Sequence, residues 1–591
     1  MLKGLNSFIA FLLIISSSAT LAVHVDYDRT GQVALLPYYT VNESFITNFT
    51  VTNTTDRFKA VRVRLLDSRI SGDLLDINLY LSPFDIWNAT LRKDPGTGLP
   101  NLITEDESCT YPDKAELQAG VDFQNVYTET TDDDLTEGYI EIIEMGEIAD
   151  GEGPATDGDL IAEIDFSGVA DGALSISDRS IPAGILHDVA GVPADCSVVT
   201  AAWAAGAIST STVNGFEPGS MGASGIAQDS GDPALPYDNS HNAGLVAPGG
   251  GINAYAILIN VGSGSAYVEE GVHIDRYTTV SQHYLPDDPV HYRLPSLASG
   301  DVREAYITNE PGDGRKGDTL PLTEYDTGAL HNIAPLPSVP MGSNPLPISL
   351  ILSSTSVSAP YFIEESANGV TDVVLTFPMR KHGIYNGGEL TNQLNQSEAA
   401  CAGSLDDGVN DGAEVNLASL NALVQDYPHD GSGNLCENAG YDLSARDLLT
   451  HLQFYDYEEG VGLLGGVWDD IGVPLPVEDM ILERSVNVNT ILSEDGGTSE
   501  LFGSPNDNDY ALLLFSGFKA GWLKFIFSSN RYSYILNDTI ISLTEPVGGL
   551  GVGIANGWSG VPVIGFAAMS AVVGTGRPGE TIELIRKSDR N

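Results

Sequence analysis

The sequence predicts a mainly β protein built from β-sandwich modules, with long loops and a small helical insertion pinned by a disulfide. Short runs of alternating apolar and polar side chains recur along the chain, which is the pattern of half-buried strands. Clusters rich in Asp, Asn and Gly separate these runs, as turns require. Hydrophobic residues make up 42% of 591 residues, so several cores can be filled. A chain of this length is expected to divide into domains.

The first 22 residues are typical of an export signal. Lys3 supplies the positive start, Phe8–Ile15 forms a short apolar core, and Ser16–Ala22 contains the small residues of a cleavage site. A run of about eight apolar residues is too short to cross a bilayer. We therefore expect cleavage near Ala22, no direct membrane insertion of the mature chain, and a location outside the cell or on its outer surface.

Residues 23–200 are predicted to form an N-terminal β-sandwich region with acidic loops. The polar stretch Asn53–Asp56 has the short side chains of a tight turn. We therefore expect the strands on either side of it, Phe45–Thr52 and Phe58–Asp67, to pair as a hairpin. Further along the chain, Gly138–Met145 has the composition of another strand.

The alternation in Phe58–Asp67 also predicts which side chains share a face. Val61 and Val63 alternate with Arg62 and Arg64. Successive side chains of a strand point to opposite faces. The valines are therefore expected in the core, and the arginines on the opposite face of a half-buried strand.

The rest of the chain divides by composition. Gly, Ser and Ala dominate residues 201–250, which are expected to form loops. Strand patterns return in a central region, 251–400, and in a C-terminal region, 461–591, with long proline-containing connections over about 262–372. The expected strands are Ala254–Val261, Val373–Phe377, Val486–Leu492, Tyr510–Phe515, Gly521–Phe527 and Val561–Ala567.

Residues 401–460 are predicted to form a partly helical insertion. Leucines at helical spacing mark Glu414–Asp426, and Ala445–Phe454 is a second possibility for a helix. No repeat is evident, which argues against a solenoid or a propeller.

The chain has four cysteines, and an even, sparse number in an exported chain points to disulfides. Three pairings are possible. Proximity in the sequence favours Cys109 with Cys196 and Cys401 with Cys436, and the second bridge would pin the insertion.

The charge balance limits the partners. The chain has 81 Asp and Glu residues against 27 Lys and Arg residues, a net charge of −54. Such a field repels phosphate backbones and anionic lipids, so no nucleic acid partner is expected. The acids form either a solvated surface or, in part, a surface that binds calcium.

Motifs for cofactors and catalysis are missing from the sequence. There is no GxSxG, no HExxH, no P-loop and no GxGxxG in a βαβ setting, and no Ser, His and Asp constellation can be singled out. No organic cofactor or catalytic residue is therefore assigned. The five tryptophans are expected in cores, although Trp87, Trp468 or Trp522 in a cleft with two carboxylates would support glycoside hydrolysis.

Two groups of residues are candidate cation sites. His283, Asp287, Asp288 and His291 could converge on a transition metal across a turn. Calcium prefers six to eight oxygen ligands on a flexible loop. A solvated acidic loop is the alternative for the calcium candidate, which consists of Asp406, Asp407, Asn410, Asp411 and Glu414.

Several segments, in order along the chain, resemble exported or cell-surface β-rich proteins of marine and other Gram-negative bacteria whose activity is not established. The resemblance implies an extracellular β-rich protein and carries over no catalytic residue. It also draws attention to a basic strand end in an acidic protein, Arg380, Lys381 and His382, which either offsets neighbouring acids or contacts another copy. The resembling segments are Gln32–Thr40, Val51–Asp67, Asp76–Trp87, Gly138–Met145, Val373–Lys381 and Pro562–Ala567.

Together these observations favour a secreted or outer-surface protein that acts in adhesion, extracellular matrix or surface assembly without catalysing a reaction. Other copies of itself or surface glycans are the expected partners. The alternative is a secreted protein that binds carbohydrate or hydrolyses glycosides.

Overall fold

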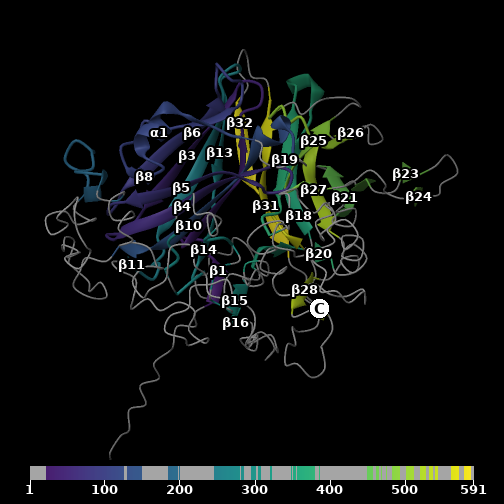
Figure 1. Cartoon of the computed structure of the whole chain (residues 1–591). Coiled ribbons are helices and arrows are strands. Elements are labelled where there is room, and N and C mark those ends of the chain that lie inside the picture. Colours follow the sequence, from purple (N-terminus) through teal and green to yellow (C-terminus); the bar gives the residue numbers. More distant parts are fainter. Residues whose placement is uncertain are drawn as a thin grey trace, which may run out of the picture.

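The computed structural model describes residues 22–124, 130–148, 184–197 and 245–279 and, with gaps, parts of 281–386 and 449–587. Strands dominate these residues and are arranged as two β-sandwiches side by side (Figure 1). The prediction of a mainly β fold is thus confirmed.

The first sandwich packs a ten-stranded sheet against a six-stranded sheet, with helix α1 (Lys114–Ala119) and a 3-10 turn (Asp132–Leu135) in its connections. The ten-stranded sheet contains, in spatial order, β16 (Leu320–Pro321), β15 (Glu304–Ile307), β1 (Ala22–Val25), β14 (Val272–Asp275), β2 (Val33–Thr40), β10 (Glu137–Ile148), β4 (Phe58–Asp67), β5 (Asp73–Leu81) and β8 (Cys109–Tyr111), with β11 (Leu245–Val246) paired to β10. The six-stranded sheet contains β13 (Ser265–Glu270), β12 (Ile252–Asn260), β3 (Phe45–Asn53), β6 (Ile86–Lys93), β7 (Pro100–Ile103) and β9 (Val121–Asp122).

The core of the first sandwich confirms the alternation predicted for β4. Val61, Val63 and Leu65 lie between the two sheets with Trp87 of β6. Strand β4 is not half-buried, however, because all ten of its residues are buried. Its second face is covered by other parts of the chain, so amphipathic alternation here does not mark a surface strand.

The predicted hairpin of β3 and β4 is wrong. Strand β3 pairs with β6 and β12 in one sheet, whereas β4 pairs with β5 and β10 in the other. The Asn53 side chain does form the expected turn, but its Nδ2 donates to the Arg57 carbonyl at 2.6 Å and to the Ser82 carbonyl at 2.8 Å. This turn is therefore tied to the end of β5, and the chain crosses from one sheet to the other.

The second sandwich consists of two five-stranded sheets. The first, called the β27 sheet, contains β22 (Val461–Leu464), β21 (Leu449–Asp456), β27 (Ala520–Phe527), β18 (Ser356–Phe362) and β33 (Ile585–Lys587). The second, called the β19 sheet, contains β26 (Asn508–Ala511), β25 (Val486–Leu492), β19 (Val370–Thr376), β31 (Ile564–Ser570) and β32 (Gly579–Glu583). The remaining short elements are β17 (Ser353–Ser354), β20 (Tyr385–Asn386), β23 (Val467–Trp468), β24 (Pro474–Leu475), β28 (Tyr532–Leu536), β29 (Thr539–Ser542), β30 (Val561–Pro562) and a 3-10 turn (Glu365–Ala367).

The second of the two predicted helices, Ala445–Phe454, is a strand, β21, in its described residues. Leu452 and Phe454 point into the core of the second sandwich, while Gln453 and Tyr455 are only partly buried. This period of two is that of a strand, so a helix over Ala445–Phe454 is wrong for its described residues.

The central proline-containing stretch also holds more structure than predicted. Strands β13, β14 and β18 lie within 262–372, where long connections were expected. In β18, Pro360 occupies an outward position opposite Trp522, between inward Ala359 and Tyr361. One proline inside an alternating segment therefore did not prevent a strand.

A third core joins the two sandwiches. Phe502, which precedes β26, lies at its centre: its ring centroid is 5.2 Å from that of Tyr38, 5.3 Å from Tyr267, 5.7 Å from Phe45 and 6.1 Å from Phe566. Three of these rings belong to the first sandwich and one to the second. In Figure 1 the two sandwiches accordingly meet along β13, β32 and β31.

Candidate functional site

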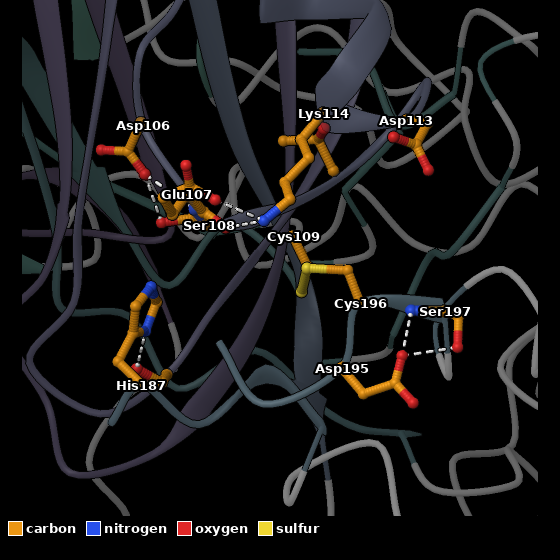
Figure 2. Close-up of a disulfide and its surroundings, with 12 residues drawn as sticks. Asp106, Glu107, Ser108, Cys109, Asp113, Lys114, His187, Asp195, Cys196 and Ser197 are labelled. Carbon is orange, nitrogen blue, oxygen red and sulfur yellow. Dashed lines mark hydrogen bonds and ion pairs between the residues drawn. A yellow bond between two sulfur atoms is a disulfide. The ribbon is translucent and has the colours of Figure 1, made fainter. Parts of the chain in front are cut away.

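The disulfide of the first sandwich holds residues 184–197, called the covering segment, on the outer face of the ten-stranded sheet. Cys109 of β8 is bonded to Cys196, with 5.2 Å between their Cα atoms, so this predicted pairing is confirmed. Figure 2 shows the bridge beside Lys114, whose Nζ lies 2.6 Å from a carboxylate oxygen of Glu107. Beneath the covering segment, Ile185 packs in a buried apolar cluster with side chains of β4, β5 and β10.

Next to this bridge the fold brings a histidine together with a serine and an aspartate that lie more than 100 residues earlier in the sequence. The Nδ1 atom of His187 lies 3.0 Å from the Ser82 hydroxyl and 3.3 Å from Oδ2 of Asp85. The Ser82 amide donates to the same Oδ2 at 3.0 Å, and the Ile86 amide donates to Oδ1 at 2.8 Å. Burial raises the pKa of Asp85, and His187 offsets part of this rise.

This Ser82–Asp85–His187 cluster does not have the geometry of a catalytic triad. A triad uses one ring nitrogen to take the serine proton and the other to contact the carboxylate. Here both partners contact Nδ1, and the carboxylate also accepts from two backbone amides. The cluster therefore acts as a brace between the covering segment and the end of β5.

A second polar cluster, the ionic cluster, lies on the same outer face. Arg62 Nη1 is 3.3 Å from Asp76, and Arg64 is 3.3 Å from Asp76, 2.5 Å from Asp73 and 3.6 Å from Glu141. Both arginine side chains are almost completely buried, with 0% and 2% of their surface exposed. Burial lowers the pKa of Arg62 to about 10, partly offset by Asp76, so it remains charged at neutral pH.

The cover of the ionic cluster includes one residue of the predicted transition-metal site. His283 is buried, and its Nε2 lies 2.9 Å from the Tyr80 hydroxyl. Burial, together with nearby Arg62, holds the pKa of His283 well below its usual value, so its ring is neutral. The carbonyl of the next residue, Tyr284, accepts from Arg62 at 2.7 Å and from Asn78 at 2.8 Å. His283 therefore helps to close the first sandwich.

Most other predicted site residues lie outside the residues that the structure describes. Within the described part of the chain, no three His, Cys, Asp or Glu side chains are arranged to hold a metal ion, and no helix is long and apolar enough to cross a membrane. The predicted residues without a described position are Asp287, Asp288, His291, Arg380, Lys381, His382, Cys401, Asp406, Asp407, Asn410, Asp411, Glu414 and Cys436.

Two of the tryptophans have clear and opposite environments. Trp87 is completely buried in the first core and packs edge-to-face on Phe49, as expected. Trp522 of β27 was also expected in a core, but 42% of its surface is exposed. Its indole stacks on Tyr455 of β21 with ring centroids 3.8 Å apart and an angle of 3° between the planes.

The exposure of Trp522 could have been predicted from the sequence. Trp522 and Lys524 alternate with Leu523 and Phe525, so the tryptophan shares a face with a lysine rather than with core residues. By contrast, the brace could not have been found, because His187 is more than 100 residues from its partners.

Comparisons with known proteins do not identify a relative. No protein-family model, curated protein or solved structure matches the chain. The functional argument therefore rests on the residues and their geometry.

Proposed function

We propose that this chain is a secreted or outer-surface protein that acts by binding and assembly, in adhesion, extracellular matrix or surface assembly, and not by catalysis. One observation carries the proposal: the polar clusters of the described residues brace the fold, whereas an aromatic pair is presented outward. Ser82, Asp85 and His187 have the wrong geometry for nucleophilic catalysis, and the ionic cluster is sealed under its cover.

Export agrees with this proposal. Cleavage after Ala22 would leave Val23–Val25 of β1 available to pair with β14 and β15. The resemblance to exported bacterial proteins and the excess of acids fit the same location.

The alternative, a carbohydrate-binding or glycoside-hydrolysing protein, is supported by the exposed Trp522. Hydrolysis needs two carboxyl groups on either side of the sugar bond. The in-register neighbours of Trp522 are Tyr455 and Pro360, and neither is an acid. This observation favours binding over hydrolysis.

The test of the proposed function is the behaviour of the mature protein in solution and on cells. Light scattering and negative-stain microscopy, with and without millimolar calcium, would measure assembly, and pull-down on cells and glycans would measure binding. We expect assembly or binding in at least one of these assays. A particle that stays monomeric, ignores calcium and binds neither cells nor glycans would contradict the proposal.

A further inference from the structure

The outward side of the β27 sheet carries an ordered set of side chains. Along β27, Leu523 and Phe525 point into the core of the second sandwich, while Trp522 and Lys524 point away from it. Strand pairing places Tyr455 and Pro360 on either side of Trp522, and Gln453 and Ser358 on either side of Lys524. We call these residues, with exposed Ile585 of β33 opposite Ser358, the Trp522 face.

The two aromatic rings of this face, those of Trp522 and Tyr455, stack on each other. Because the rings are parallel and 3.8 Å apart, one side of the Trp522 indole is covered by Tyr455 of β21. The Tyr455 hydroxyl donates to Gln453 at 2.8 Å, which fixes the phenol ring. Strand β18 lies on the other side of β27, so the second side of the indole faces the space above Pro360. Strand β33 lies two strand spacings, roughly 10 Å, from β27, on the far side of β18.

The C-terminal part of the sequence, which supplies β27 and β33 to this face, is less acidic than the chain as a whole. Seven Lys and Arg residues and five Asp and Glu residues lie between Lys519 and Asn591, whereas the whole chain has 27 and 81. Lys524 stands in the middle of the Trp522 face, about 7 Å along β27 from the indole. On this face, Lys524 is the ammonium group that an anionic ligand would meet beside the indole.

We propose that the Trp522 face binds an acidic polysaccharide. A sugar ring has an apolar C–H side that can lie on the second side of the indole, where stacking removes both surfaces from water. Lys524 then pairs with the carboxylate of a neighbouring uronic acid unit. The proposal rests on the proposed function, because it names a partner class for a protein that acts by binding.

A protein partner fits this face less well. Stable protein interfaces bury about 800 Å² on each side around a contiguous apolar centre. Here the exposed apolar side chains Trp522 and Ile585 are separated by Ser358 and Pro360, so they do not form a contiguous apolar centre.

The test is affinity electrophoresis of the mature protein in native gels that contain pectate, alginate or hyaluronan, with neutral dextran as the reference. Nonspecific attraction is suppressed because both protein and polymer are acidic. We expect at least one acidic polymer to retard the wild type, and Trp522→Ala to lower its affinity about tenfold or more. Lys524→Gln should weaken binding to the acidic polymer several-fold and reduce its salt dependence.

The matched control is Val268→Ala, which truncates an exposed apolar residue of the first sandwich and should bind as the wild type does. Trp522→Ala should stay folded and melt only slightly below the wild type, because it removes a partly exposed side chain and its stack on Tyr455. Failure of all three acidic polymers to retard the wild type, or equal retardation of Trp522→Ala, would overturn the proposal. If Trp522→Ala instead abolishes self-association and no polymer binds, the face is a protein contact, and the proposed function survives without this inference.

Discussion

Individual charged residues show how a strongly acidic chain can bury ionisable groups. Arg64 is buried among Asp73, Asp76 and Glu141, so its positive charge is compensated inside the fold. Glu137 of β10 is different, because neutral groups donate to it: the hydroxyls of Tyr38 and Ser504 at 2.9 Å and the Asn42 side-chain amide at 3.3 Å. The contributions of Arg64 and Glu137 to stability should therefore depend differently on pH and on mutation.

Removing Arg64 should be strongly destabilising. Arg64→Leu leaves three carboxylates buried without their main cation, and we expect a loss of about 3–5 kcal/mol in the free energy of unfolding. Arg29→Leu is the matched control, since Arg29 pairs with Glu270 at the surface and should contribute less than about 1 kcal/mol. Urea unfolding measures both, and equal effects would contradict a special role for the ionic cluster.

Glu137 should make stability depend on pH. Burial raises its pKa to about 7 from 4.5, so the folded state holds a proton that the unfolded state releases. Its stabilising effect is therefore complete below pH 4.5 and is lost as the pH rises to about 7, by up to about 3 kcal/mol. Glu137→Gln cannot titrate and should gain stability relative to the wild type at pH 7.5 but not at pH 4.5.

The control for this comparison is Glu105→Gln, at an exposed position. Urea unfolding at both pH values gives the free energies. A difference between wild type and Glu137→Gln that stays the same at pH 4.5 and 7.5 would mean that Glu137 does not titrate in this range.

At the scale of elements, local patterns predicted strands better than their partners. The alternation of β4, β25 and β27 is visible in the sequence because one face of each strand is apolar. The pairing of β3 with β12 could not be seen in the sequence, because the two strands are about 200 residues apart. The turn at Asn53 did not help, because it is compatible with either a hairpin or a crossover. The sequence did not show that Arg62 is buried either, because the residue that packs over it, Tyr284, is more than 200 residues away.

The candidate sites show the same difference between local features, which the sequence predicted, and contacts between distant strands, which it did not. Cys109 and Cys196 could be paired because only three connectivities exist for four cysteines. The surroundings of Trp522 required the register of three strands, of which only β27 was predicted correctly.

The covering segment held by Cys109 and Cys196 should depend on its disulfide. The bridge closes a loop with a sequence separation of 87 residues, and chain entropy gives it about 4–5 kcal/mol. We expect the free energy of unfolding of the double variant Cys109→Ala/Cys196→Ala, measured with denaturant, to fall by that amount or somewhat less. Adding a reductant should shift the wild type toward the variant and leave the variant unchanged, whereas insensitivity of the wild type to both would contradict the pinning role.

At the scale of the whole molecule, the third core makes two sandwiches into one body. Besides the rings around Phe502, polar contacts cross the junction: Thr376 donates to the Pro37 carbonyl at 2.6 Å, and the Ser485 amide donates to the Arg69 carbonyl at 3.0 Å. Both sandwiches therefore lose buried contacts if they separate. A fixed arrangement of this kind suits a protein that presents surfaces, such as the Trp522 face, at a constant orientation.

Scanning calorimetry of the mature chain is the most direct test that the two sandwiches form one body. A shared core predicts a single unfolding transition whose calorimetric and van't Hoff enthalpies agree. Phe502→Ala, which should cost about 3–5 kcal/mol, is expected to lower the melting temperature and split this transition in two. Two independent transitions in the wild type, with Phe502→Ala shifting neither, would contradict a single body.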